Sequence, residues 1–208
     1  MYLENMKVNH YFLFTFAFLL LSCSEDVNCE PCPDCDIDRQ YTENYQPSIE
    51  AVTAPSLVIL GTIQDAGSPH INCHKSCCEK LHSNPDKNRM ITSLGYIDPI
   101  NEQKYLFEAT PDISRQLSNL SEFEIFSNND IPDAVFLTHA HIGHYTGLMY
   151  FGKEATNTHL TPVFTMPKMA DFLKSNGPWD QLTSEQNIAL KELTDGLEQK
   201  INSNLSVT

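Results

Sequence analysis

Short apolar runs, each bounded by turn-forming residues, recur along the chain from residue 56 onwards. A run of four to eight apolar or β-branched residues between such boundaries is typical of a buried strand. Two of the runs are separated only by residues 99–103, which predict the turn of a β-hairpin. The predicted strands are residues 56–62, 93–98, 104–109, 134–137 and 161–166.

Segments with a helical character lie between these strands. The predicted helices are residues 79–82, 113–120, 146–152 and 167–175. Leu148, Met149 and Phe151 are expected to face inward, and Trp179 is expected to be a packing residue. Residues 184–197 show no clean period, so the pattern leaves helix and extended structure open. Strands that alternate with helices predict an α/β (α+β layered) fold class.

Length and charge restrict the kind of protein. The chain has 208 residues, which is enough for one domain with a sizeable core. Its 13 Lys and Arg residues against 27 Asp and Glu residues give a net charge of −14. A surface of this sign repels phosphates, so nucleic acid is not expected as a partner.

The first 23 residues have the pattern of a targeting segment. Lys7 precedes an apolar run at residues 11–21, which is too short to span a membrane comfortably and suits a signal-peptide core. The run ends at Cys23 in a sequence that resembles a bacterial lipobox, with a plain signal peptide or a signal anchor as alternatives. Lipidated Cys23 would tether the protein to a membrane of the bacterial cell envelope, facing the periplasm or the exterior.

Residues 24–50 predict an acidic disordered linker, since they are rich in carboxylates and poor in large aliphatic residues. Within it, Cys29, Cys32 and Cys35 could bind a metal or pair as a disulfide. Prolines and acids surround them and no histidine is near, so we favour a structural or incidental role. Residues 51–208 are the predicted globular domain.

Three histidines within six residues follow the predicted strand at residues 134–137. They are His139, His141 and His144. They fall where a strand ends and a loop begins, which is the edge of layered α/β folds where ligands usually bind. Neutral imidazole is the commonest metal-binding side chain, and the geometry suits one or two divalent metals, zinc first. Three ordinary loop histidines are the plainer alternative.

The histidine segment resembles the His-x-His-x-Asp-His motif of the metallo-β-lactamase superfamily of metal-dependent hydrolases, and the flanking residues 61–73 resemble its PqqB-like branch. The resemblance implies an αββα sandwich, with His139 and His141 as primary ligands. His144 would hold a second metal or orient water. Gly143 occupies the position of the family's aspartate, a ligand of the second metal. Asp65 or Asp112 could be substitute or indirect ligands.

A second candidate metal site lies at residues 73–78. Related proteins carry a Cys-x-Cys-x-x-Cys cluster here that binds structural zinc in some of them, and Cys73 and Cys78 match its outer positions. Lys75 occupies the middle position, so Cys77 or His74 would have to be the third ligand. A disulfide or free thiols are the alternatives. Asp112 has a further possible role, as the N-cap of the helix at residues 113–120.

The resemblance also implies distant histidine ligands, for which His159 lies too close to the motif. We therefore expect a partial, incomplete metallo-β-lactamase domain. The function expected of the whole is zinc-dependent hydrolysis of a small-molecule ester, phosphodiester, lactone or lactam. The alternatives are a lipid-anchored metal- or ligand-binding protein without turnover, or an inactive truncated fragment.

Overall fold

The computed structural model describes residues 51–124, 126 and 129–208. The predicted signal peptide, the acidic linker, the lipidation site Cys23 and the thiols Cys29, Cys32 and Cys35 lie outside the described residues. No helix among the described residues is long and apolar enough to cross a membrane.

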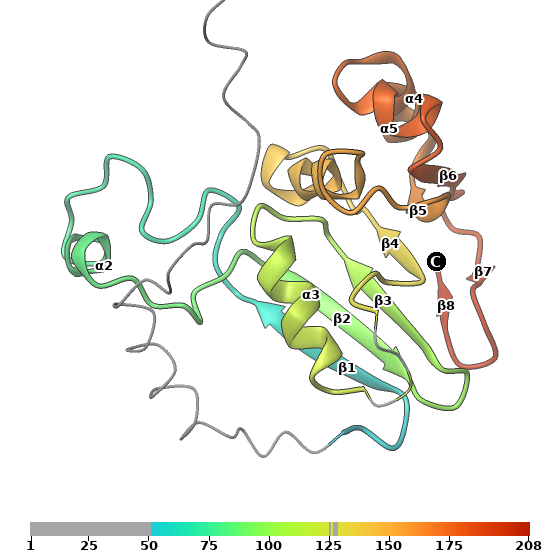
Figure 1. Ribbon diagram of the computed structural model, residues 1–208, viewed down its shortest axis with the longest axis horizontal. Coiled ribbons are helices and arrows are strands. Elements are labelled where there is room, and N and C mark those ends of the chain that lie inside the picture. Colours follow the sequence, from blue (N-terminus) through green and yellow to red (C-terminus); the bar gives the residue numbers. More distant parts are fainter. Residues whose placement is uncertain (1–50, 125, 127–128) are drawn as a thin grey trace, which may run out of the picture. The chain divides into compact units, whose positions relative to one another are not determined.

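One mixed sheet organises the described part of the chain (Figure 1). Its strands follow one another in space in the same order as in the sequence. The first three pair antiparallel, and β3 to β6 pair parallel. The strands are β1 (Ser56–Gly61), β2 (Ser93–Asp98), β3 (Gln103–Phe107), β4 (Ala134–Phe136), β5 (Thr161–Thr165) and β6 (Ile188–Glu192).

Helices cover one face of this sheet. In Figure 1, α3 lies across β1 to β3, and α4 and α5 lie beside β5 and β6. The main core forms beneath them, where Ile97, Leu106 and Val135 are fully buried against Leu120 of α3. The helices are α2 (Glu79–Ser83), α3 (Ile113–Ser121), α4 (Pro167–Ser175) and α5 (Trp179–Ser184), with 3₁₀ turns η2 (Ile142–His144) and η3 (Thr146–Phe151).

The opposite face of the sheet carries an aromatic row. Phe136 of β4 stacks on Phe107 and on Phe164, with ring centroids 4.8 Å apart in each pair. The short hairpin of β7 (Gln199–Lys200) and β8 (Ser206–Val207) contributes residues that pack against this row. Leu57 and Ile59 of the edge strand β1 remain 66% and 70% exposed. Both faces of the sheet are therefore apolar, as a layered fold requires.

The predicted strands, the hairpin and most helices are confirmed, and so is the α/β class. Trp179 packs edge-to-face on Tyr145, with centroids 5.1 Å apart. Residues 188–192 form β6, which settles the segment that the sequence left open.

One expectation about side chains was wrong, and another is met only in part. Residues 146–151 form a 3₁₀ helix, and Met149 is 56% exposed because the tighter winding turns it away from the core. Asp112 occupies the N-cap position of α3, as considered above, but its side chain makes no capping hydrogen bond. Its carboxylate accepts hydrogen bonds from the Ile91 backbone N–H (2.9 Å) and from Arg115 instead.

Candidate metal centre

The backbone places the three histidines at the edge of the sheet where β3 and β4 end. Beyond β4, Leu137 still donates to the Phe164 carbonyl, and the chain then turns into η2. Ala109, just after β3, donates to the His144 carbonyl (2.9 Å) and accepts from Gly147 N–H (2.8 Å). The carboxyl ends of two parallel neighbours thus support the histidine loop from below, which is the usual place for a site in this class of fold.

The three imidazole rings converge. The ring centroid of His139 lies 4.5 Å from that of His141 and 4.3 Å from that of His144. One nitrogen from each ring can be chosen so that all three lie within 4.8 Å of one another. Ligand atoms on one tetrahedral zinc are about 3.4 Å apart, so small ring movements would bring these donors onto one ion. The site is open, since the His141 side chain is 73% exposed.

A buried carboxylate stands behind two of the rings. Glu108 follows β3, and its Oε1 accepts hydrogen bonds from both the backbone N–H and the hydroxyl of Thr138. The hydroxyl proton is thereby used, so Thr138 Oγ1 accepts from His139 Nδ1 (2.8 Å), which leaves the lone pair of His139 on Nε2. Glu108 Oε2 lies 3.6 Å from His144 Nδ1.

These two facing atoms, Glu108 Oε2 and His144 Nδ1, are buried and have no hydrogen-bond partner among the described residues. Burial raises the pKa of Glu108 to about 7, although the hydrogen bonds from Thr138 oppose the rise. Burial, and next the neighbouring His139, lower the pKa of His144, while the Asp65 carboxylate opposes this shift. A histidine held neutral is in the form that binds metal.

The structure brings Asp65 to the histidines and keeps Asp112 elsewhere. Asp65 Oδ2 lies 3.6 Å from His141 Nδ1. Gly143, at the motif position where the family has aspartate, lies directly against Asp65: a Cβ on Gly143 would be 2.3 Å from the Asp65 carbonyl oxygen. The Asp112 carboxylate is engaged with Ile91 and Arg115, as described above.

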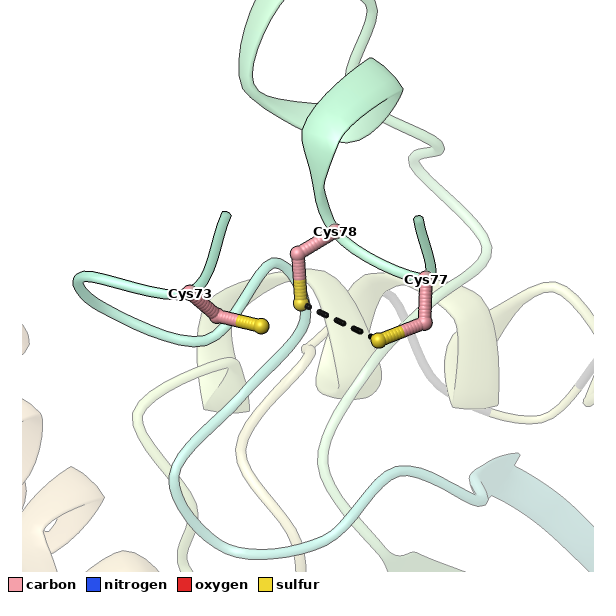
Figure 2. A group of neighbouring side chains, drawn as sticks. All are labelled: Cys73, Cys77 and Cys78. Carbon is pink, nitrogen blue, oxygen red and sulfur yellow. Dashed lines mark hydrogen bonds between the residues drawn. The ribbon is translucent and has the colours of Figure 1, made fainter. Parts of the chain in front are cut away.

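Three cysteines form a second group. Figure 2 shows the side chains of Cys73, Cys77 and Cys78 pointing toward one another just before α2. Their sulfur atoms lie within 4.8 Å of one another, with Cys77 and Cys78 3.8 Å apart, and within the part of the chain that the structure describes none of the three forms a disulfide. His74 is not part of this group, although its ring lies 6.4 Å from that of His82. His82 lies next to the cysteines, with its Nε2 3.1 Å from the Cys73 carbonyl oxygen.

Sequence reasoning did not find Glu108 and Thr138. A glutamate after a strand and a threonine before a histidine are ordinary residues, and β3 and β4 are separated by 26 residues. The available signal was topological: two consecutive parallel strands end at the same edge, so the residues that follow them meet.

Comparisons with known proteins agree with this architecture. The family described as Beta-lactamase superfamily domain matches residues 103–208. The Zn²⁺-bound PqqB from Methylobacterium extorquens is similar in structure, with a TM-score of 0.59 and 23% sequence identity over 73% of this chain and 54% of that chain. A new diphosphatase from the PhnP family gives a TM-score of 0.51 and 19% identity over 71% of this chain and 53% of that chain.

This chain therefore spans about half the length of each of these two structures. A search of curated proteins found no match. The identities to the solved structures are low, so they support the fold alone. The family match covers just over half of the chain. The matched residues include the histidine segment, the two strands β3 and β4 that support it, and the aromatic row. On this match, the chain belongs to the beta-lactamase superfamily domain family.

Proposed function

We propose that this chain forms the metal-binding part of a metal-dependent hydrolase. The ion is a divalent metal, zinc first, held by His139, His141 and His144. The substrate is a small molecule with an ester, phosphodiester, lactone or lactam bond. The observation that carries this proposal is the convergence of three imidazoles, two of which are backed by Glu108 and its partner Thr138.

The residues fit a bound cation. Buried polar atoms normally have partners, and an unpaired pair such as Glu108 Oε2 and His144 Nδ1 needs an explanation. A cation on the far side of the His144 ring would favour a proton on Nδ1 and negative charge on Glu108, so that the two atoms would attract each other. Ligating histidines usually donate their second N–H to a carboxylate in this way.

The arrangement assigns each side chain a task. When bound, the divalent ion would lower the pKa of water to about 7 and polarise the scissile group. His139, with Nδ1 donating to Thr138, presents Nε2. Thr138 holds the ring of His139, and Glu108 would orient the ring of His144 when an ion is bound. The exposed His141 side of the site is where water and substrate can approach.

Binding without turnover is the second candidate. The specific observation in its favour is that position 143 has no room for a side chain, so the motif itself adds no carboxylate to the site. A site of three neutral imidazoles holds an ion but carries less negative charge to balance it.

The test is His141→Ala in the full chain. We expect the variant to lose one equivalent of bound zinc, because the ring is a proposed ligand and, being exposed, contributes little to the core. Metal content by mass spectrometry and a panel of phosphodiester and ester substrates are the measurements. His159→Ala, which removes another exposed histidine, is the matched control.

Unchanged zinc content in His141→Ala would contradict the assignment. If His141→Ala loses zinc but the wild-type protein hydrolyses none of the substrates in the panel, the binding protein without turnover is favoured. We also propose that Cys73, Cys77 and Cys78 form a structural metal site. For the N-terminal segment, we propose that lipidated Cys23 tethers the protein to the cell envelope.

A further inference from the structure

Position 143 is closed to side chains by the loop that carries Asp65. A Cβ placed on Gly143 would meet the Asp65 carbonyl oxygen at 2.3 Å and the Asp65 Cβ at 2.6 Å. Backbone atoms cannot move aside as the end of a flexible side chain can. Glycine is therefore needed here for close approach of two backbones, and not for an unusual dihedral angle.

The chain around Asp65 is held in place from both sides. Ile63 N–H donates to the Met90 carbonyl (3.0 Å), and Gln64 brackets the turn by accepting from Ala66 N–H (2.9 Å) and donating to the Gly67 carbonyl (2.9 Å). This fixes the direction in which the Asp65 side chain leaves the loop. The contact with Gly143 then brings the loop directly against η2, the turn between His141 and His144.

The Asp65 carboxylate is directed at the histidines and is free to bind. Its Oδ2 lies 3.6 Å from His141 Nδ1, beyond the usual length of a hydrogen bond. Two donor atoms on one tetrahedral zinc are separated by about 3.4 Å. Among the described residues, no group donates a hydrogen bond to this carboxylate, so its lone pairs remain available.

The Asp65 carboxylate would balance part of the positive charge of a bound metal ion. Three neutral imidazoles leave the full double charge of a divalent ion uncompensated, and a carboxylate oxygen is a common additional zinc ligand. We propose that Asp65 is a ligand of the metal ion and provides, from the loop after β1, the carboxylate that Gly143 cannot provide. This inference rests on the proposed function, because it presupposes a metal at the histidines.

The experiment compares the wild-type full chain with Asp65→Asn, using zinc titration against a chelator and the visible spectrum of the cobalt-substituted protein. Asparagine keeps the size but not the charge of the side chain. We expect zinc affinity at the histidine site to fall by about 100-fold or more, beyond the loss of about 10-fold to 100-fold typical of a group that only orients a ligand. The cobalt bands should also change, because the set of ligands changes. Thiolate-to-cobalt absorption identifies metal on the cysteines and should stay constant.

Asp171→Asn is the matched control, since Asp171 is an exposed aspartate on α4. It should leave affinity and spectrum unchanged. Gly143→Ala should weaken zinc binding as Asp65→Asn does, because its methyl group displaces the Asp65 backbone. Gly143→Asp should not rescue Asp65→Asn, since the obstruction is main-chain. Circular dichroism melting verifies that each variant folds, which Asp65→Asn should do because its side chain is 36% exposed.

The outcomes separate the two proposals. Wild-type protein without zinc at the histidines would overturn the proposed function. Wild-type protein with zinc there, but with affinity and cobalt bands unchanged in Asp65→Asn, would overturn only the assignment of Asp65. A fall in affinity with an unchanged cobalt spectrum would also overturn ligation, because it would show that Asp65 only orients His141.

Discussion

At the scale of single residues, Glu108 combines two unusual properties with a firmly held backbone. Its φ of 73° is in the left-handed region, which costs a residue with a side chain about 1–2 kcal/mol. Its carboxylate is buried, and its Oε2 has no hydrogen-bond partner in residues 51–124, 126 and 129–208. Its backbone is held by the bond from its N–H to the Phe136 carbonyl (2.9 Å). Such strain persists where neighbouring structure enforces it, and here it aims a carboxylate at Thr138 and His144.

Glu108→Gln should therefore weaken metal binding. The glutamine oxygen can still accept from Thr138, but its NH₂ group would face His144 Nδ1 and favour the opposite tautomer. We expect about a 10-fold to 100-fold loss of zinc affinity at the histidine site, the range typical of groups that orient a ligand. Chelator competition measures it. Glu185→Gln, on an exposed glutamate, is the control; equal affinities in the two variants would exclude a positioning role for Glu108.

The residues of the site differ in how far the sequence predicted them. Spacing alone indicated His139, His141 and His144, because all three come from one loop. Asp65 and Asp112 were equal candidates until the structure placed one beside His141 and the other on Ile91. Asp65 lies in the 31-residue connection between β1 and β2, and its place beside His141 depends on the path of that connection. The pattern of apolar and polar residues does not predict this path.

At the scale of elements, the connection between β1 and β2 has little regular structure of its own. α2 has five residues and none of them is buried. A helix this short is unstable unless contacts elsewhere hold it. Cys78, which precedes it, is buried, and the thiols of Cys73 and Cys77 lie beside it. The proposed metal at these thiols would fix the connection, which also carries Asp65.

We predict that Cys77→Ser lowers the melting temperature of the metal-loaded protein and makes it less sensitive to a chelator. Cys77 is exposed, so the serine itself should disturb packing little. Thiolate-to-cobalt absorption should also decrease. Cys32→Ser, in the predicted acidic linker, serves as the comparison. If a reducing agent, and not a chelator, lowered the wild-type melting temperature, the thiols would be acting as a disulfide instead.

Elements were predictable where their apolar residues were contiguous. β2, β3 and β4 are mostly buried, and each contains a contiguous apolar or aromatic stretch: Tyr96-Ile97, Tyr105-Leu106-Phe107 and Ala134-Val135-Phe136. β6 was missed because it has only one buried residue, at Ile188, and ends in charged residues. Lys104 is a charged residue that is buried, which the pattern of apolar residues does not predict. Its ammonium lies 2.9 Å from the carboxylate of Glu124, 20 residues further along the chain.

At the scale of the whole described domain, a cluster of hydrogen bonds around Asp98, called the polar clasp below, holds the β7–β8 hairpin segment on the aromatic face. Asp98, at the end of β2, is fully buried and accepts hydrogen bonds from the side chains of Asn101, Asn202 and Asn204. Burial alone would raise the pKa of Asp98, but the hydrogen bonds from Asn101, Asn204 and Ile100 outweigh it, and the pKa is lowered.

Asp98→Asn should release this segment and reduce the free energy of unfolding by about 2 kcal/mol, since hydrogen bonds to a charged group are lost. The contribution of Asp98 is present above its ordinary value of 3.8 and is lost as the pH falls through the lowered folded value. Urea unfolding across that range, with hydrogen exchange over residues 199–207, measures it. Asp195→Asn, on an exposed loop, is the control. An acid profile identical in wild type and Asp98→Asn would contradict the clasp.

The strand order has a consequence for how the domain forms. Every strand from β2 to β6 pairs with the one made just before it, so the sheet can grow at one edge as the chain leaves the ribosome, with no strand inserting between two others. The loop of His139 to His144 is supported by β3, β4 and the backbone at Ala109, with one bond at Leu137 to β5, and the Asp65 segment that lies against Gly143 comes earlier in the chain than all of these. The proposed metal-binding loop can thus be shaped during synthesis before β6 has emerged.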